Sequence, residues 1–179
     1  MKTLKTILMG VVSALGIVGF ISAATTVNQT VTMQVNAICV LAVTGNPSTL
    51  TVSAPASGGQ TPTNPSSSAT YAQYTSTVPA SQSRKLTAAW GASDAAPAGC
   101  SLKLSATPSG GTNQGATAGQ ITLSATAQDI VTTIKSCATG TSASNGAQLT
   151  YTLSVDTLTS LVASESKTAT ITLTLTDAA

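Results

Sequence analysis

Aliphatic residues and threonines alternate along several segments of this chain with a period of two residues. The clearest case is TATITLTLTDA, close to the C-terminal end of the sequence. Successive side chains of a β-strand point to opposite faces, so this alternation predicts a strand with one apolar and one polar face. No segment shows the period of an amphipathic helix, which is about 3.6 residues. The apolar face of this last strand carries Ala169, Ile171, Leu173 and Leu175.

Short segments of this kind recur along the chain, separated by turns rich in Gly, Pro, Ser and Asn. About eight or nine strands at such short spacing, without crossover helices, are typical of an antiparallel immunoglobulin-like β-sandwich with an extended N-terminal strand, and a β-barrel is the alternative. Residues 54–70 are dominated by Pro, Gly, Ser and Thr, so we expect an exposed and mobile loop there. Strands are expected at residues 25–43, 49–53, 71–78, 84–90, 100–106, 120–125, 148–155 and 168–178, and a strand or one helical turn at 126–137.

The first residues have the features of a secretory signal peptide. Lys2 and Lys5 form a basic start, an uncharged apolar stretch follows, and Ser22 and Ala24 are the small residues that a cleavage site requires. The mature protein is expected to be secreted, extracellular or at the cell surface, with no membrane span after the leader is cleaved. The expected organisation is a signal peptide at 1–24, an N-terminal extension at 25–37 and a β-sandwich domain at 38–179.

Charged residues make up only 7% of the sequence, and histidine is absent. Removal of Lys2 and Lys5 with the leader leaves as many basic as acidic residues, so the mature chain has no basic footprint for nucleic acid. Without histidine there is no imidazole for a catalytic base or for a metal site. The few carboxylates are scattered and form no cluster of the kind that binds calcium. We therefore expect neither an enzyme nor a cofactor.

The three cysteines are too far apart in the sequence for a zinc knuckle. Exported proteins commonly form disulfides. Cys100 opens an expected strand and Cys137 closes a segment before a loop, so a Cys100–Cys137 disulfide is predicted. Cys39 lies on the apolar face of the first expected strand. It is either a small buried side chain or the site of a disulfide between subunits, and its pairing with another of the three cysteines stays open.

The segment at residues 25–43 alternates throughout and is much longer than an ordinary strand of about five or six residues. In one interpretation the whole segment pairs within its own sandwich, and the change to an apolar second face at Ile38 marks where the strand becomes buried on both sides. In the other, residues 25–37 insert into the next subunit and pair with its sheet edge, which builds a head-to-tail filament because such a contact does not close on itself. The apolar row of this extension consists of Val27, Val31, Met33, Val35 and Ala37, with Gln29 as its only interruption.

An exported Thr-rich and Ala-rich sandwich with this alternating first segment resembles the subunits of donor-strand-exchanged extracellular fibres, namely chaperone–usher pilins, spore-coat U-like proteins and biofilm-matrix fibre proteins. The resemblance implies a structural role, no cofactor and self-association. Chaperone–usher pilins usually have a disulfide between their first strands and a tyrosine near the C-terminus, whereas here two cysteines come late and the chain ends in Asp177-Ala178-Ala179. The full final strand also gives no sign of a missing strand, which favours a self-complete or matrix-fibre-like subunit.

These features predict an exported structural protein, a subunit of an extracellular filament or pilus that assembles by donating its N-terminal strand. Its expected partners are further copies of itself in a head-to-tail homopolymer, together with export or assembly machinery. The alternative is a monomeric binding module or adhesin whose ligand contacts the loops at 54–70 and 109–119 and whose first strand is intramolecular. The aromatic residues are expected to pack in the core or on a sheet face rather than to form a sugar platform: Tyr71, Tyr74, Trp90 and Tyr151.

Overall fold

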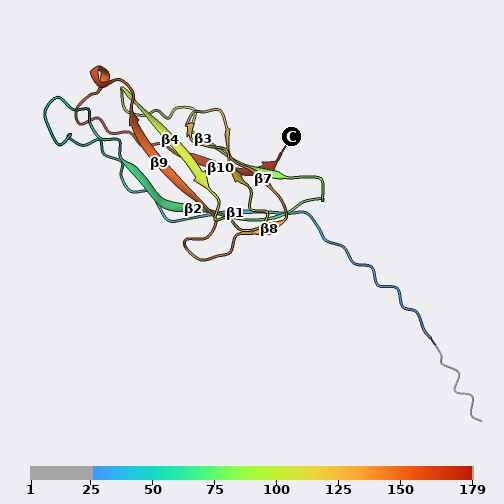
Figure 1. Cartoon of the computed structure of the whole chain (residues 1–179). Helices are drawn as coiled ribbons and strands as arrows, with labels where there is room; N and C mark the ends of the chain where they lie inside the picture. Colours follow the sequence, from blue (N-terminus) through green and yellow to red (C-terminus); the bar gives the residue numbers. More distant parts are fainter. Residues whose placement is uncertain (1–25, 179) are drawn as a thin grey trace, which may run out of the picture. The chain divides into compact units, whose positions relative to one another are not determined.

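The computed structural model describes residues 26–178, and the expected signal peptide lies outside these residues. The described chain is all-β, with two antiparallel sheets packed face to face as a sandwich (Figure 1). The sandwich expected from the sequence is therefore confirmed. The larger sheet contains, in spatial order, β1 (Ile38–Thr44), β2 (Ser66–Thr77), β9 (Ala147–Val155), β4 (Cys100–Thr107) and β6 (Ile121–Thr122), with β8 (Cys137–Ala138) also paired to β2. The smaller sheet contains β10 (Ile171–Asp177), β3 (Arg84–Trp90), β7 (Gln128–Ile134) and β5 (Ala116–Thr117), and a short 3₁₀ helix, η1 (Leu158–Ser160), lies between β9 and β10.

The alternation in the sequence becomes alternating burial in the strands. In β9, Leu149, Tyr151 and Leu153 are buried, whereas the intervening Thr150 and Thr152 are only partly buried. The side chains of adjacent residues point to opposite faces of a strand, so one face of β9 packs inward and the other meets solvent. The same rule places the inward-facing aliphatic side chains of both sheets in one shared core.

The core is built from aliphatic residues and two tyrosines. Tyr74 and Tyr151 are buried and Trp90 packs against the core, so these aromatic residues have the packing role that the sequence predicted. Burial raises the pKa of both tyrosine hydroxyls, because the charged phenolate is poorly solvated inside the sandwich. The largest fully buried aliphatic side chains are Leu86, Leu104, Leu123, Ile130, Val131, Ile134 and Leu149.

Three expected segments differ from the structure. The long first strand is absent, since residues 26–37 have no regular secondary structure and β1 begins at Ile38. The expected strand at 49–53 is reduced to an isolated bridge between Ser53 and Thr63. The expected loop at 54–70 ends early because β2 starts at Ser66, and both Ser67 and Thr70 are buried. A polar sequence alone does not show that a partner strand, here β9, covers these residues.

In the interpretation that the whole first segment pairs within its own sandwich, the outer face of β1 is buried from Ile38 onward, and the structure does not show this burial. Ile38 is 40% exposed and Val40 is 57% exposed. Both residues lie in a strand at the edge of the larger sheet, and the described chain places no further layer over that face. Apolar residues on both faces of a strand are common in fully buried strands, but the pattern does not reveal whether a covering layer exists.

One residue of β7 has an unfavourable backbone conformation. Thr133 has φ 55°, in the left-handed region, and it lies in a bulge where two residues of β7 oppose the single residue Lys85 of β3. β-branched residues rarely adopt this conformation, whereas asparagine tolerates it.

Replacement of Thr133 by asparagine is therefore expected to raise the free energy of unfolding by about 1 kcal/mol, because it relieves backbone strain at an exposed site. The matched control is Thr174→Asn, at an exposed position on β10 outside the left-handed region, where a change within about 0.5 kcal/mol is expected. Urea unfolding of the three proteins measures both changes. Equal effects of the two substitutions would contradict the assignment of strain to Thr133.

Candidate functional site: an exposed apolar row and two free sheet edges

The apolar row predicted in the N-terminal extension is exposed to solvent. Val27 is 84% exposed, Val31 66%, Met33 87% and Val35 84%, and Ala37 is exposed as well. Exposed large apolar side chains are common singly, but several in alternating sequence are typical of a surface that a partner covers. Residues 26–37 form no strand in the described chain, so the long first strand of the first interpretation is present only from Ile38 onward.

The beginning of β1 is fixed to β2 by the Thr77 side chain. The Ile38 N–H donates a hydrogen bond to the Thr77 hydroxyl oxygen at 2.6 Å, and the Thr77 hydroxyl donates to the Asn36 carbonyl oxygen at 2.9 Å. These bonds hold the backbone from Asn36 to Ile38 alongside β2. The chain therefore enters β1 beside the end of β2.

Two strands at one side of the sandwich have only one partner each. Among the described residues, β1 pairs only with β2, and β10 pairs only with β3. The two strands are near each other, because the Cys39 thiol donates a hydrogen bond to the Leu175 carbonyl oxygen over 3.5 Å. We call this side the open side. It is defined by alternate residues of its two strands, Cys39, Leu41 and Val43 on β1 and Ile171, Leu173 and Leu175 on β10. Of these, Leu41 and the three β10 residues lie in the core or pack against it.

The main-chain groups of β10 alternate between its partner and solvent. The Ala178 N–H donates to the Ser83 carbonyl at 2.9 Å, and at the other end the Gly91 N–H donates to the Thr170 carbonyl at 3.2 Å. In an antiparallel ladder every second residue bonds to its partner, so the even-numbered residues of β10 bond to β3. The N–H and C=O groups of Ile171, Leu173 and Leu175 therefore point to the open side.

The same geometry holds for β1. The Tyr74 main chain bonds to Thr139, with the Thr139 N–H donating to the Tyr74 carbonyl at 3.0 Å. Neighbouring residues of β2 must then direct their main-chain groups to β1, where Gln73 pairs with Ala42 and Thr75 with Val40. The odd-numbered residues of β1 thus direct their N–H and C=O groups away from β2, to the open side.

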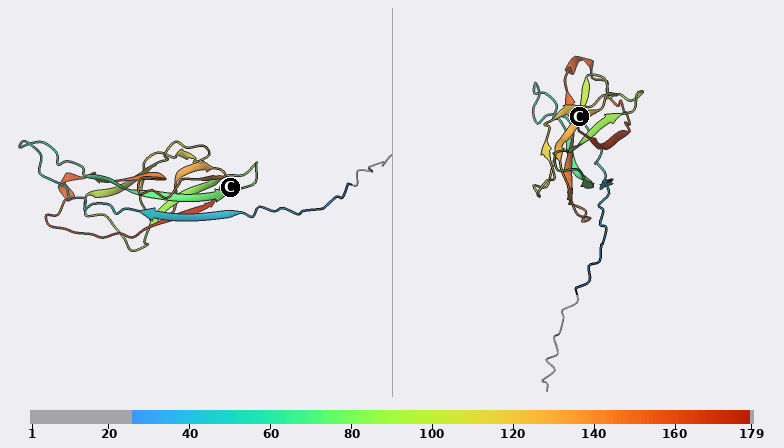
Figure 2. Two further views of the ribbon diagram at one scale, coloured as in Figure 1. Left: turned by 90° about the horizontal axis from the view of Figure 1, so that it is seen from below. Right: turned by 90° about the vertical axis from the view of Figure 1, so that its right-hand side faces the viewer.

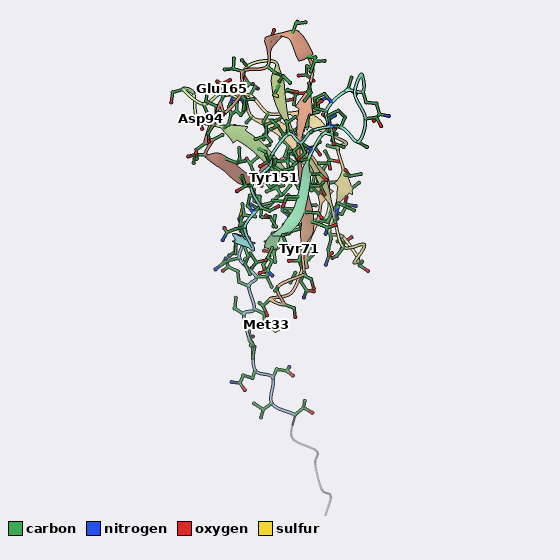
Figure 3. The ribbon with its side chains drawn as sticks, turned by 90° about the vertical axis from the view of Figure 1, so that its left-hand side faces the viewer. Met33, Tyr71, Asp94, Tyr151 and Glu165 are labelled. Atoms are coloured by element: carbon green, nitrogen blue, oxygen red, sulfur yellow. The ribbon has the colours of Figure 1, made fainter. Side chains whose placement is uncertain are left out.

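An aspartate fixes the start of β10. The Asp94 carboxylate accepts hydrogen bonds from the Gly91 N–H at 3.0 Å and from the Thr170 N–H at 2.7 Å, which ties the end of β3 to the residue before β10. Glu165 lies at the same end of the sandwich (Figure 3) and accepts a bond from the Ala98 N–H at 2.9 Å. Both carboxylates accept hydrogen bonds from main-chain N–H groups and so hold the chain on either side of the loop between β3 and β4.

The Glu165 contact predicts an acid-sensitive contribution to stability. The Ala98 N–H and, next, Lys167 at 3.3 Å lower the pKa of the Glu165 carboxyl below its ordinary value of 4.5. Because the folded state holds this group charged, the contribution is present above the ordinary pKa and is lost as the pH falls through the lowered pKa of the folded state. The urea midpoint of the wild type is therefore expected to fall more steeply below about pH 4.5 than that of Glu165→Gln. Parallel curves for the two proteins would contradict this role.

The predicted disulfide is not formed, since all three cysteines are free. Cys100 pairs with Val155 at one end of the larger sheet, whereas Cys137 pairs with Ser76 near the far end of β2. The length of β2 separates them, and at about 3.4 Å per residue this far exceeds the Cα separation of about 7 Å that a disulfide allows. The disulfide was predicted because both cysteines lie beside loops. The prediction failed because the sequence does not reveal at which end of the sheet each loop lies.

Cys39 and Cys137 both lie opposite Ser76, on either side of β2. Two strand spacings of about 4.8 Å keep them too far apart for a disulfide within one chain. Cys39 is exposed, so the expectation of a small buried side chain is wrong. Burial raises the pKa of the Cys137 thiol, and burial followed by the charges of Asp156 and Glu165 raises that of Cys100.

The alternative function would use the loop at 109–119 for ligand binding. Hydrogen bonds of the buried Gln114 hold this loop in place. Gln114 is buried, its side chain bonds to Ser109 and to the Ala138 carbonyl, and its own carbonyl accepts a bond from the Tyr74 hydroxyl. Nothing in these contacts joins this loop to residues 54–70 in one binding surface.

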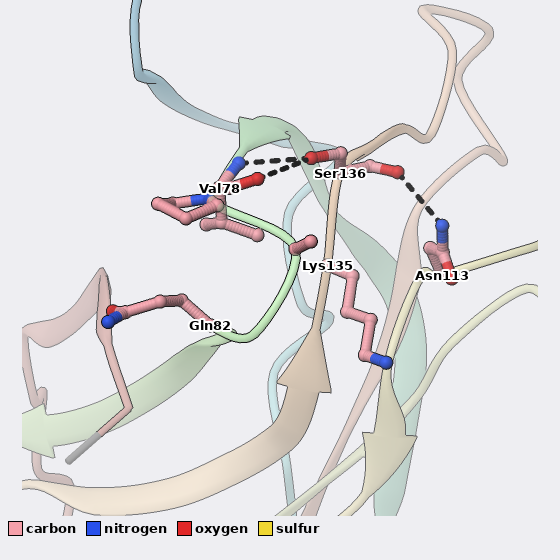
Figure 4. A pocket seen from close by; sticks show the side chains of 7 residues that line it. Val78, Gln82, Asn113, Lys135 and Ser136 are labelled. Atoms are coloured by element: carbon pink, nitrogen blue, oxygen red, sulfur yellow. Dashed lines mark hydrogen bonds between the residues drawn. The ribbon is translucent and has the colours of Figure 1, made fainter.

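A surface hollow lies where β2 ends and β7 ends (Figure 4). The Ser136 hydroxyl bonds to the Val78 main chain, and the Asn113 amide donates to the Ser136 carbonyl at 3.2 Å. These polar groups form hydrogen bonds with one another. The Lys135 amine is the charged group that lines the hollow, and the bonded groups do not surround it as a binding site.

Within residues 26–178, His, Cys, Asp and Glu side chains form no group of three or more that could hold a metal ion. The same part of the chain contains no helix long and apolar enough to cross a membrane. Comparisons of the sequence and structure with protein-family models, curated proteins and solved structures gave no match.

Proposed function

We propose that this protein is a structural subunit of an extracellular filament or pilus, and that it assembles when the N-terminal extension of one copy pairs with the sandwich of the next. The proposal includes export through the signal peptide and a position outside the cell. No catalytic step and no cofactor belong to it.

The observation that carries the proposal is the exposed alternating row Val31, Met33 and Val35 in a segment without a partner strand. An extended segment with one apolar face adds to a sheet edge through main-chain hydrogen bonds, while its side chains bury apolar surface. At about 25 cal/mol per Å² of apolar area, each fully buried valine or methionine contributes about 1.5 to 3 kcal/mol. The polar residues of the other face, such as Thr30 and Thr32, remain in water.

The same observation favours the filament over the monomeric binding module. That alternative requires a first strand that is paired and buried within its own sandwich, whereas residues 26–37 are exposed and form no strand. A contact between different surfaces of two copies leaves each end of the pair able to bind another copy, so it continues as a filament. The near-zero net charge of the mature chain also supports association.

The test introduces charges into the apolar face of the extension in the full mature chain. Val31→Asp combined with Met33→Asp is expected to abolish filaments in negative-stain electron microscopy, because two carboxylates cannot be buried in an apolar contact without a large desolvation cost. The melting temperature of the sandwich is expected to stay unchanged, since both side chains are exposed in the single chain.

The matched control is Thr30→Asp combined with Thr32→Asp, which adds the same charge to the face that remains in water. Filaments are expected from this control and from the wild type. If the wild type remains monomeric, or if the Val31/Met33 variant forms filaments as the wild type does, the proposed function is wrong.

A further inference from the structure

We propose that Asn28 carries an N-linked glycan, which a glycosyltransferase outside the cytoplasm transfers to the N-terminal extension from a lipid-phosphate-linked oligosaccharide. This modification site goes beyond the proposed function. It shares with that function only the export of the chain, and it does not depend on the assembly of filaments.

The first argument is the sequence around Asn28. Asn28-Gln29-Thr30 is an acceptor triplet for N-linked glycosylation, which consists of asparagine, any residue except proline, and serine or threonine. Two further asparagines, Asn46 and Asn64, have a serine at the same spacing, but in both triplets the middle residue is proline. Proline fixes φ and lacks the N–H, and triplets with proline at this position are not acceptors. Asn28 thus begins the one complete acceptor triplet of the sequence.

The second argument is the exposure of the triplet. Asn28, Gln29 and Thr30 are all exposed, and both views of Figure 2 draw the described part of the extension as an extended trace that forms no strand. Asn64, by contrast, is used by the fold, since its side-chain oxygen accepts a hydrogen bond from the Val155 N–H at 2.9 Å. Glycans are bulky and are attached at surface positions. The extension therefore offers Asn28 to a transferase without any unfolding of the sandwich.

The third argument is the face on which Asn28 lies. Side chains alternate along an extended chain, and the apolar row of the extension includes Val31 and Met33. Asn28 and Thr30 belong to the other set of alternate residues, together with Thr32. A glycan on Asn28 therefore points away from the apolar row, and it leaves that row free to be covered by a partner.

The position also gives the glycan a physical role. Charged residues make up only 7% of the sequence, and a chain with so few charges has little electrostatic protection against unspecific association. The exposed Val31 and Met33 lie within a few residues of Asn28. A glycan is bulky and solubilising, so it keeps this part of the chain in solution while the apolar row is uncovered.

The transfer forms one bond and breaks one. The side-chain nitrogen of Asn28 attacks the anomeric carbon of the first sugar, and the bond between that carbon and the phosphate oxygen breaks. The lipid phosphate leaves with the electron pair of the broken bond, and the nitrogen loses one proton to a base of the transferase. No oxidant or reductant takes part.

Mass spectrometry of the full chain, exported with its own leader by the cells that make it, tests the inference. The mature wild type is expected to be heavier than its polypeptide by one oligosaccharide, and peptide fragmentation is expected to place the sugar on Asn28. Asn28→Gln and Thr30→Ala are each expected to lose this extra mass completely, because either change destroys the triplet. The matched control is Thr32→Ala, on the same face but outside the triplet, and it is expected to keep the extra mass.

A bare polypeptide mass for the wild type would overturn the inference, and so would an oligosaccharide that remains in Asn28→Gln. Pro47→Ala sharpens the test because it completes a second triplet at the exposed Asn46. This variant is expected to carry two oligosaccharides. A sugar on Asn46 without one on Asn28 would show that the cells glycosylate complete triplets but not the extension, which would also overturn the inference. Microscopy of the same samples scores filament assembly separately.

Discussion

Replacement of Gly146 by alanine is expected to lower the free energy of unfolding by at least about 3 kcal/mol. Gly146 lies immediately before β9 and has φ +101°, a conformation that residues with a Cβ rarely adopt. A Cβ at this position would also lie 2.1 Å from the Ala72 carbonyl oxygen of β2. That oxygen is main chain, so it cannot move aside as a flexible side chain would, and the start of β9 must shift away from β2.

Gly119 provides the matched control for this substitution. Its φ of +94° is similar, but no atom lies within 4 Å of a Cβ built on it. Gly119→Ala therefore keeps the backbone strain and lacks the collision, and its expected cost is about 1 to 3 kcal/mol. Urea unfolding of the two variants measures the difference. Equal destabilisation would mean that the approach of Gly146 to Ala72 does not matter for stability.

Replacement of Leu104 by alanine is expected to cost about 2 to 5 kcal/mol, the range for leucine to alanine substitutions in a packed core. Leu104 is fully buried in β4, opposite Tyr151 of β9. The effect is large because two costs add. The apolar surface of the leucine is no longer buried, and the surrounding strands cannot collapse to fill the cavity that it leaves.

The comparison for Leu104 is Leu158→Ala in η1. Leu158 is 52% exposed, and the change is expected to stay within about 0.5 kcal/mol. Thermal and urea unfolding of both variants provide the measurement. A Leu104→Ala protein as stable as Leu158→Ala would show that the core does not depend on this side chain.

The sequence was sufficient for the class of fold and for the inward faces of several strands. Alternation at residues 148–155 and 168–178 predicted β9 and β10, and it placed Ile171, Leu173 and Leu175 on the apolar face of β10. Such predictions succeed because a strand has a period of two residues, and this period is visible in any sequence. The alternating row Val31, Met33 and Val35 was visible for the same reason.

The sequence was not sufficient where the outcome depended on which strands are neighbours. It predicted a Cys100–Cys137 disulfide, but the pairing of β4 with β9 and of β8 with β2 places these residues at opposite ends of one sheet. One interpretation of the first segment required burial of Ile38 and Val40 on the outer face of β1, yet no described segment covers that face. The sequence also gave no sign of a missing strand, because the final strand is complete. Only the sheet order shows that β10 is an edge strand with a partner on one side.

The period-two pattern thus determined by itself that the chain is built of strands with aliphatic inner faces, because side-chain alternation is a local property of the backbone. The tertiary structure alone decided that β1 and β10 are edge strands on the same side, that the thiols are free, and that the core remains partly exposed at Leu41, Ile171 and Leu173. Those properties depend on the order of strands in two sheets. That order is set by contacts between residues far apart in the sequence, and no local pattern records it.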